Sequence, residues 1–191
     1  MSRRAPKNVK IDRFVERQMK NWEISSRQTT PPPEDGKPPL HLAVTISREA
    51  GCRGEAIAEC LAKRLGWPKY DREILDYMAE QTNVRRHLLE IIDEKHYSWM
   101  EDLMQILVSE AATERRNYFP ILNRAILTIC ANEHAVIVGR GANFILPREF
   151  AMRIRLVAPL EYRVAKFAEE NDLDPNQARD QIQQIETSRA K

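Results

Sequence analysis

The stretch AVTISREAGCRGEAIAECLAKRLGW, residues 43–67, places a short apolar run before a glycine-containing loop and then a helical pattern. The apolar run ends near Ser47, and the loop contains Gly51 and Gly54. A glycine loop between a strand and a helix points backbone N–H groups into one concavity, and the helix N-terminus adds partial positive charge. This layout is typical of a phosphate-binding loop.

The loop departs from the standard motif G-x-x-x-x-G-K-[ST], in which a lysine reaches the outer phosphates and a hydroxyl holds magnesium. On the most natural overlay, Gly54 stands at the lysine position and no hydroxyl follows it. Arg48 and Arg53 are the available cations, and an arginine can hold phosphate through two nitrogens. Taken alone, the loop has two interpretations: a phosphate site, or an ordinary turn with both arginines in water.

The bulk composition bounds the class of protein. A chain of 191 residues, 42% hydrophobic and 30% charged, suffices for one sizeable globular domain. No apolar stretch approaches the roughly 20 residues that span a membrane, and the charged N-terminus has no signal-peptide core, which predicts a cytoplasmic protein. The cysteines, Cys52, Cys60 and Cys130, match neither a disulfide framework nor a metal-ligand spacing, so no metal site is predicted.

Residues 1–40 form a basic N-terminal extension of the domain at 41–191. Apolar side chains recur at helical spacing in residues 11–24, which predicts an amphipathic helix. The proline-rich stretch at 25–40 then tethers this helix, which could dock on this domain, on a second copy or on a partner. The extension holds nine Lys or Arg against five Asp or Glu. A nucleic-acid-binding arm is therefore one hypothesis, ranked below a solvated arm.

Strand and helix patterns alternate through the rest of the chain. Strands are predicted at 42–46, 67–71 (or an extended link), 134–139 and 152–158. Helices are predicted at 55–65, through 72–132, from Pro159 and from Pro175, with capping boxes at Ser98–Glu101 and Asp174–Gln177. Continuous apolar strands between helices favour an α/β fold with a parallel sheet covered on both faces. Ligands of such folds bind beyond the carboxyl ends of the strands.

Further candidate residues follow the predicted strands. Asp71 and Arg72 could contact a sugar, a base or a second phosphate, or Asp71 could simply cap the next helix. Arg140 stands between two glycines and could clamp a phosphate or lie in a surface turn. Arg163 and Arg189 lie on later helices. Mobile arginines often close over transferring phosphates, although arginines on helix surfaces are more common.

Three segments together resemble one family. TISREAGCRGEAIAECLAKRLGWPKYDREIL, AVIVGRGANFIL and RIRLVAPLEYRVAKF occur in the order and spacing of the cytidylate kinase-like proteins, nucleoside monophosphate kinases with a degenerate Walker A loop. The resemblance covers about residues 42–191. It implies a P-loop nucleotide kinase fold with a central parallel sheet flanked by helices. It also implies phosphoryl transfer from ATP with Mg²⁺ to a nucleoside monophosphate, CMP or dCMP by default.

The resemblance also implies a role for each candidate residue. The donor-phosphate loop would comprise Arg48, Gly51, Cys52, Arg53, Gly54 and Glu55. The acceptor would be bound by Asp71, Arg72 and Arg140. The catalytic residues, which neutralise charge on the transferred group, would be Arg53, Arg163 and Arg189.

The sequence departs from the family pattern at several positions. Cys52, Arg53 and Glu55 break the usual composition of the loop, and Glu55 places negative charge near the phosphates. Gly141 stands where the family has an aspartate. Family members have a final strand and a loop that packs on adenine, and by the resemblance both should follow the position of Lys191. The resemblance thus implies either a truncated chain or a domain without one strand and part of the donor site.

A catalytically inactive nucleotide-binding or regulatory protein is the competing hypothesis. Its working surface would be the helix at 11–24, which would dock a partner or a second copy through Phe14, Met19 and Trp22. Turnover of CMP separates this hypothesis from an active kinase.

Overall fold

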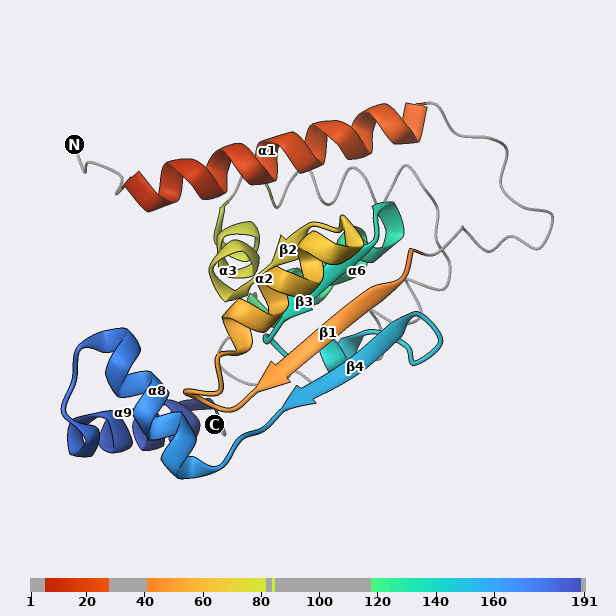
Figure 1. Cartoon of the computed structure of the whole chain (residues 1–191). Coiled ribbons are helices and arrows are strands. Elements are labelled where there is room, and N and C mark those ends of the chain that lie inside the picture. The colour runs from red at the N-terminus through yellow and green to blue at the C-terminus, as the bar shows by residue number, and fades with distance from the viewer. Residues whose placement is uncertain (1–5, 28–40, 82–83, 85–117, 190–191) are drawn as a thin grey trace.

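The described residues form a central parallel sheet with helices on both faces (Figure 1). The computed structural model describes residues 6–27, 41–81, 84 and 118–189. The predicted capping box at Ser98–Glu101 lies outside them. Within these residues the architecture confirms the predicted α/β class.

The sheet contains four parallel strands in the order β2–β3–β1–β4. Their bounds are β1 Ala43–Arg48, β2 Lys69–Tyr70, β3 Ala135–Val138 and β4 Ala151–Leu156. Strand β1 runs two residues beyond its predicted end, because Ser47 and Arg48 pair with Arg155 and Leu156 of β4. Since all strands run the same way, their carboxyl ends meet at one edge of the sheet.

One or two described helices follow each strand along the chain, and another helix precedes the first strand. Their bounds are α1 Pro6–Arg27, α2 Gly54–Leu65, α3 Arg72–Glu80, α6 Tyr118–Asn132, α7 Ala142–Ile145, α8 Leu160–Asn171 and α9 Pro175–Arg189. Helix α9 begins with the predicted capping box. Asp174 accepts a hydrogen bond from the N–H of Asn176, and the Asp174 N–H donates to the side chain of Gln177 at 3.4 Å. The short helix α7 was not predicted from the sequence.

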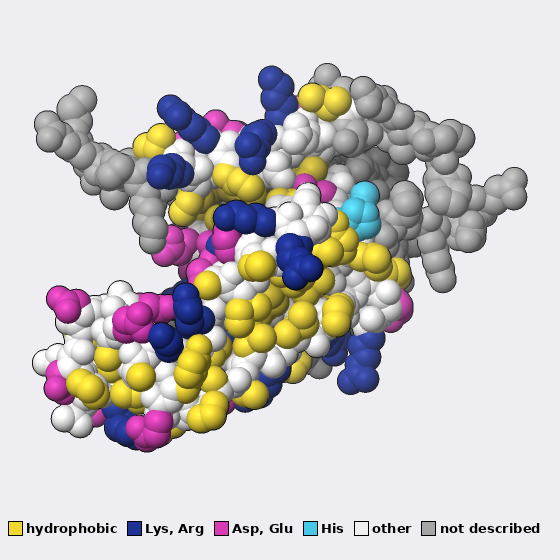
Figure 2. Space-filling view, viewed as in Figure 1, with side chains coloured by type: hydrophobic (Ala, Val, Ile, Leu, Met, Phe, Trp, Pro, Cys, Tyr) yellow, Lys and Arg dark blue, Asp and Glu magenta, His cyan; other side chains and the backbone are white. Residues whose placement is uncertain are grey.

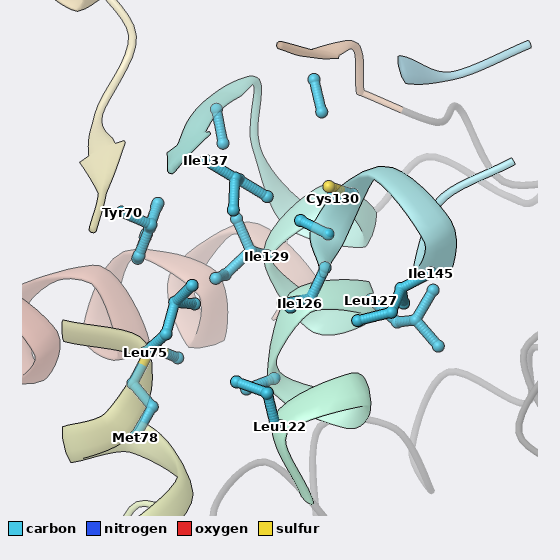
Figure 3. Close-up of a cluster of buried hydrophobic side chains, with 14 of the residues drawn as sticks. Tyr70, Leu75, Met78, Leu122, Ile126, Leu127, Ile129, Cys130, Ile137 and Ile145 are labelled. Carbon is cyan, nitrogen blue, oxygen red and sulfur yellow. The ribbon is translucent and has the colours of Figure 1, made fainter. Parts of the chain in front are cut away.

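Apolar cores lie on both faces of the sheet, because alternate strand residues point to opposite sides. On one face α2 packs through Ala58 and Ala62 against Val44 and Ile46 of β1. The larger core on the other face gathers side chains from β2, α3, α6, β3 and α7 (Figure 3). A third cluster joins the α8–α9 hairpin to the loop after β1; it consists of Ala50, Val164, Ala178 and Ile182.

Helix α1 is docked on the same chain and crosses the domain above α3 (Figure 1). Its side chains Val15, Met19 and Trp22 belong to the larger core. The ring of Phe14 meets that of Tyr70 edge-on at 5.4 Å. The sequence left three docking surfaces open for this helix: its own domain, a second copy or a partner. In the structure the helix docks on its own domain. It contributes to the core of that domain rather than being only tethered to it. None of the described helices combines the length and apolarity needed to cross a membrane.

Candidate functional site

The loop between β1 and α2 is packed so closely that side chains are excluded at two glycines. Gly51 has φ +80°, and a Cβ there would lie 2.6 Å from the carbonyl oxygen of Arg163. A Cβ on Gly54 would lie 2.8 Å from Cγ of Arg48. Arg53 adopts the left-handed conformation with φ 57°, which is costly for a residue with a side chain. The loop is thus a fixed and locally strained turn.

Arg163 anchors this loop to the α8–α9 hairpin. Its guanidinium is buried and donates hydrogen bonds to the carbonyls of Ala158 (3.0 Å) and Ala50 (3.2 Å). The same group forms ion pairs with Glu186 at 2.6 Å and Glu49 at 3.3 Å. These contacts hold the loop in place. The predicted direct role of Arg163 in phosphoryl transfer stays a prediction.

Arg48, Arg72 and Arg189 come together at the carboxyl edge of the sheet, and we call them the arginine cluster. The Arg189 guanidinium donates to the backbone carbonyl of Arg48 at 3.0 Å. Burial lowers the pKa of Arg189, and the charges of Arg48 and Arg72 lower it further. Within the described part of the chain, the cluster's one ion pair joins Arg72 to Asp76 at 3.7 Å. The cluster is therefore a concentration of positive charge that Asp76 and the nearby charge of Glu186 offset only in part.

The side chain of Arg48 crosses the gap between the loops that follow β1 and β3. Its stem lies against Gly54, and Nη1 lies 2.8 Å from where a Cβ on Gly139 would be. The loop after β3 is also joined directly to β1, since the Gly139 N–H donates to the carbonyl of Ile46 at 3.0 Å. Glycine at both positions leaves the room that the Arg48 side chain occupies.

Arg140 is held beside α3 by an aspartate that the sequence analysis did not single out. It has φ 52° and forms an ion pair with Asp76, and its guanidinium lies 5.8 Å from the ring centre of Tyr118. The Tyr118 hydroxyl donates to the same carboxylate, and burial raises the pKa of Tyr118. Helical i,i+4 spacing from Arg72 was a sequence signal for Asp76. No local signal pointed to Tyr118.

Asp71 caps α3, and Lys69 forms ion pairs with both Asp71 and Glu55. The Asp71 carboxylate accepts the N–H of Ile74 at 3.1 Å, so the capping alternative raised by the sequence is realised. Lys69, which sequence reasoning missed, forms ion pairs with Glu55, with Glu59 at 3.3 Å and with Asp71 at 3.7 Å. Burial tends to lower the pKa of Lys69, but these carboxylates raise it overall. The negative charge of Glu55 is thus largely compensated by Lys69.

Arg53 is directed toward α8. Its side chain forms an ion pair with Glu170 at 3.3 Å, and both side chains are about half exposed. Exposed pairs of this kind contribute little free energy, so a phosphate could compete with Glu170 for Arg53. The neighbouring Cys52 is buried and is a free thiol.

The described residues provide no preformed metal cage. No group of three His, Cys, Asp or Glu side chains among them could hold a metal ion. Magnesium, however, commonly keeps several waters and binds through one or two carboxylates together with substrate phosphates. The residues present therefore do not form a site for Mg²⁺ by themselves.

The parallel sheet, the glycine loop at its carboxyl edge and the flanking helices define an α/β protein with a nucleotide kinase-like fold. The chain belongs to the cytidylate kinase-like family, whose model matches residues 43–191. The match confirms the resemblance inferred from the sequence. Helix α1 lies outside the matched residues.

Two solved structures resemble this chain. One is an uncharacterized protein from Eubacterium ventriosum ATCC 27560, with 19% identity, a TM-score of 0.50, and coverage of 78% of this chain and 73% of that one. The other is TT1252 from Thermus thermophilus, with 16% identity, a TM-score of 0.42, and coverage of 73% and 77%. At these identities the first shows a shared fold and nothing about chemistry. No curated protein sequence matches the chain.

Proposed function

We propose that this protein transfers the γ-phosphoryl group of ATP to a nucleoside monophosphate, with CMP or dCMP as the acceptor. The observation that carries this proposal is the convergence of Arg48, Arg72 and Arg189 at the carboxyl edge of the sheet. Positive charges held close together are unfavourable by themselves, and bound donor and acceptor phosphates would relieve their repulsion. The family match supports a nucleotide as the source of that phosphate.

The donor would lie on the loop after β1. Backbone N–H groups of residues 51–54 would hold its β-phosphate, as in other strand–loop–helix phosphate sites. Arg48 would take the place of the missing lysine, because its guanidinium already lies across the carboxyl edge between two glycines. Mg²⁺ would supply charge neutralisation for the donor phosphates, and it would arrive with the nucleotide rather than in a protein cage.

The acceptor would lie beside α3, where Asp71, Arg72 and Arg140 would orient it. An oxygen of the acceptor phosphate attacks the γ-phosphorus, and a new P–O bond forms. The bond between the γ-phosphorus and the β,γ-bridging oxygen breaks, and its electron pair stays on ADP. No general base is needed, because the attacking phosphate is already ionised. Arg48 and Arg189 would neutralise charge on the transferred group.

Titration of the full chain with ATP–Mg²⁺ and then with CMP or dCMP tests this proposal, followed by a coupled assay for ADP release. The same titrations on Arg53→Ala measure how much Arg53 contributes to nucleotide affinity once the nucleotide has displaced Glu170. Binding with turnover is the expected result. No binding at millimolar nucleotide would refute the proposal.

An inactive nucleotide-binding or regulatory protein is the second candidate function. The Arg53–Glu170 ion pair favours it, because one of the two arginines available to the loop already has a carboxylate partner. Nucleotide binding without turnover would support it. Partner docking through residues 11–24 would require α1 to leave its own core, since Val15, Met19 and Trp22 are buried there.

A further inference from the structure

The docking of α1 is organised around one carboxylate, Glu133, which directly follows α6. Glu133 accepts hydrogen bonds from Nε2 of Gln18 at 2.8 and 3.0 Å, and from Nε1 of Trp22 at 3.1 Å. It also accepts the hydroxyl of Tyr70 at the end of β2. We call these four residues the Glu133 network. Two of its three donors come from α1.

This network couples the docking of α1 to the stability of the sheet edge. Burial raises the pKa of Glu133, while its three hydrogen-bond donors lower it. A carboxylate removed from water is costly unless donors satisfy it. Without α1, Tyr70 would be the one donor left to Glu133 among the described residues. The helix therefore supplies polar partners as well as apolar contact area.

Helix α1 contacts the chain both before and after the junction between β2 and α3, which contains two site residues. Before the junction it contacts Tyr70, through the ring of Phe14 and through the Glu133 network. After the junction the hydroxyl of Tyr77 on α3 donates to Asp12 of α1. Asp71 and Arg72 lie between these two attachment points. The position of Arg72 relative to Arg48 and Arg189 thus depends on where β2 and α3 are held.

We propose that α1 is a positioning element of the phosphate site, and that it fixes Arg72 in the arginine cluster by holding the β2–α3 junction through the Glu133 network and the Asp12–Tyr77 contact. Because α1 lies outside the residues that the family model matches, this function is an addition to the matched domain. The inference rests on the proposed function, since Arg72 is assigned there to the acceptor.

Two substitutions in the full-length chain test the proposal. Trp22→Phe removes the indole N–H donor and keeps an aromatic ring in the core. Glu133→Gln removes the charge and keeps one carbonyl acceptor. Trp67→Phe is the matched control, because Trp67 stacks on His134 and takes no part in the network. The measurements are the affinities for CMP and for ATP–Mg²⁺ by calorimetry, and amide hydrogen exchange across residues 71–75.

A selective loss on the acceptor side is the expected result. Trp22→Phe and Glu133→Gln should weaken CMP binding about three- to tenfold, as partial loss of a hydrogen bond to a charged acceptor would. ATP–Mg²⁺ affinity should stay within about twofold, and exchange at 71–75 should become faster. Trp67→Phe should change none of these.

Other outcomes overturn the proposal. Equal weakening of CMP and ATP–Mg²⁺ would show a merely structural role for α1, and so would faster exchange with unchanged CMP affinity. If Glu133→Gln does not fold, Trp22→Phe still decides. Failure of the unsubstituted chain to bind either nucleotide would refute the proposed function, and the positioning role with it. If instead the unsubstituted chain binds both nucleotides and the variants bind them equally well, only the positioning role is refuted.

Discussion

The guanidinium of Arg189, at the end of α9, donates a hydrogen bond to the backbone carbonyl of Arg48, at the end of β1, over 3.0 Å. The two residues are 141 positions apart in the sequence. This bond holds two cations side by side through a neutral backbone acceptor instead of a carboxylate. The positive charge therefore remains available to an anion.

Arg189→Gln should weaken binding of pyrophosphate and ATP by about tenfold or more, because a charge-assisted contact to phosphate is lost. Arg179→Gln is the control on the same helix, since Arg179 is partly exposed and forms an ion pair with Glu161. Calorimetric titration of both variants checks the prediction. Equal affinities in the two variants would contradict a phosphate role for Arg189.

Arg72→Gln should lower the affinity for CMP without lowering the stability of the fold. Arg72 is mostly exposed and repels Arg189, so its removal should leave the free energy of unfolding unchanged or raise it by up to about 0.5 kcal/mol. CMP affinity should fall at the same time. Urea denaturation at low and high salt provides the measurement, because screening should abolish any gain in stability. A loss of stability above about 1 kcal/mol would mean that Arg72 is mainly structural.

Alanine at the two loop glycines should have different effects. In Gly54→Ala the new methyl group would lie 2.8 Å from Cγ and 2.9 Å from Cβ of Arg48, so the Arg48 side chain must shift; stability should fall moderately, and phosphate affinity should fall with it. In Gly51→Ala the methyl group meets the Arg163 backbone at a positive φ, so folding should be strongly impaired. Thermal unfolding with and without pyrophosphate distinguishes these results. Equal stability of the two variants would show that the loop can relax.

Arg163→Met should destabilise the fold by at least about 2 kcal/mol, because Glu186 and Glu49 lose their partner and the carbonyl of Ala50 loses a donor. Chemical denaturation measures the loss, with Arg179→Met as the control for removing a more exposed arginine from the same hairpin. If the Arg163 variant is as stable as the control but does not turn over nucleotide, Arg163 acts directly on the phosphate.

Glu133 should make stability fall as pH rises above the ordinary glutamate range. Its folded-state pKa is raised from 4.5, so the native state holds this proton more tightly than the unfolded state. The contribution is fully present below pH 4.5 and is lost as pH rises through the folded pKa. Urea denaturation of the natural chain and Glu133→Gln across this window should give a difference that depends on pH. A constant difference would show that burial does not shift Glu133.

Local patterns predicted the unit that starts the domain. The apolar run, the glycine loop and the helical spacing of residues 43–67 depend on neighbouring residues, so β1, the turn and α2 could be read from the sequence. The same holds for the capping box at the start of α9, where Asp174 and Gln177 are three positions apart. The family resemblance, which rests on three such local segments, was confirmed.

The sequence by itself determined the α/β class, the strand–loop–helix unit and the set of candidate arginines. Only the tertiary structure decided which arginines keep their charge available. Arg48 and Arg189 meet because parallel strands end at one edge and α9 returns to it. Arg53, Arg140 and Arg163 are instead paired with carboxylates on other elements, respectively Glu170, Asp76 and Glu186. The physical reason is that electrostatic energy depends on the distance between charges and on their burial, and the order of residues gives neither quantity.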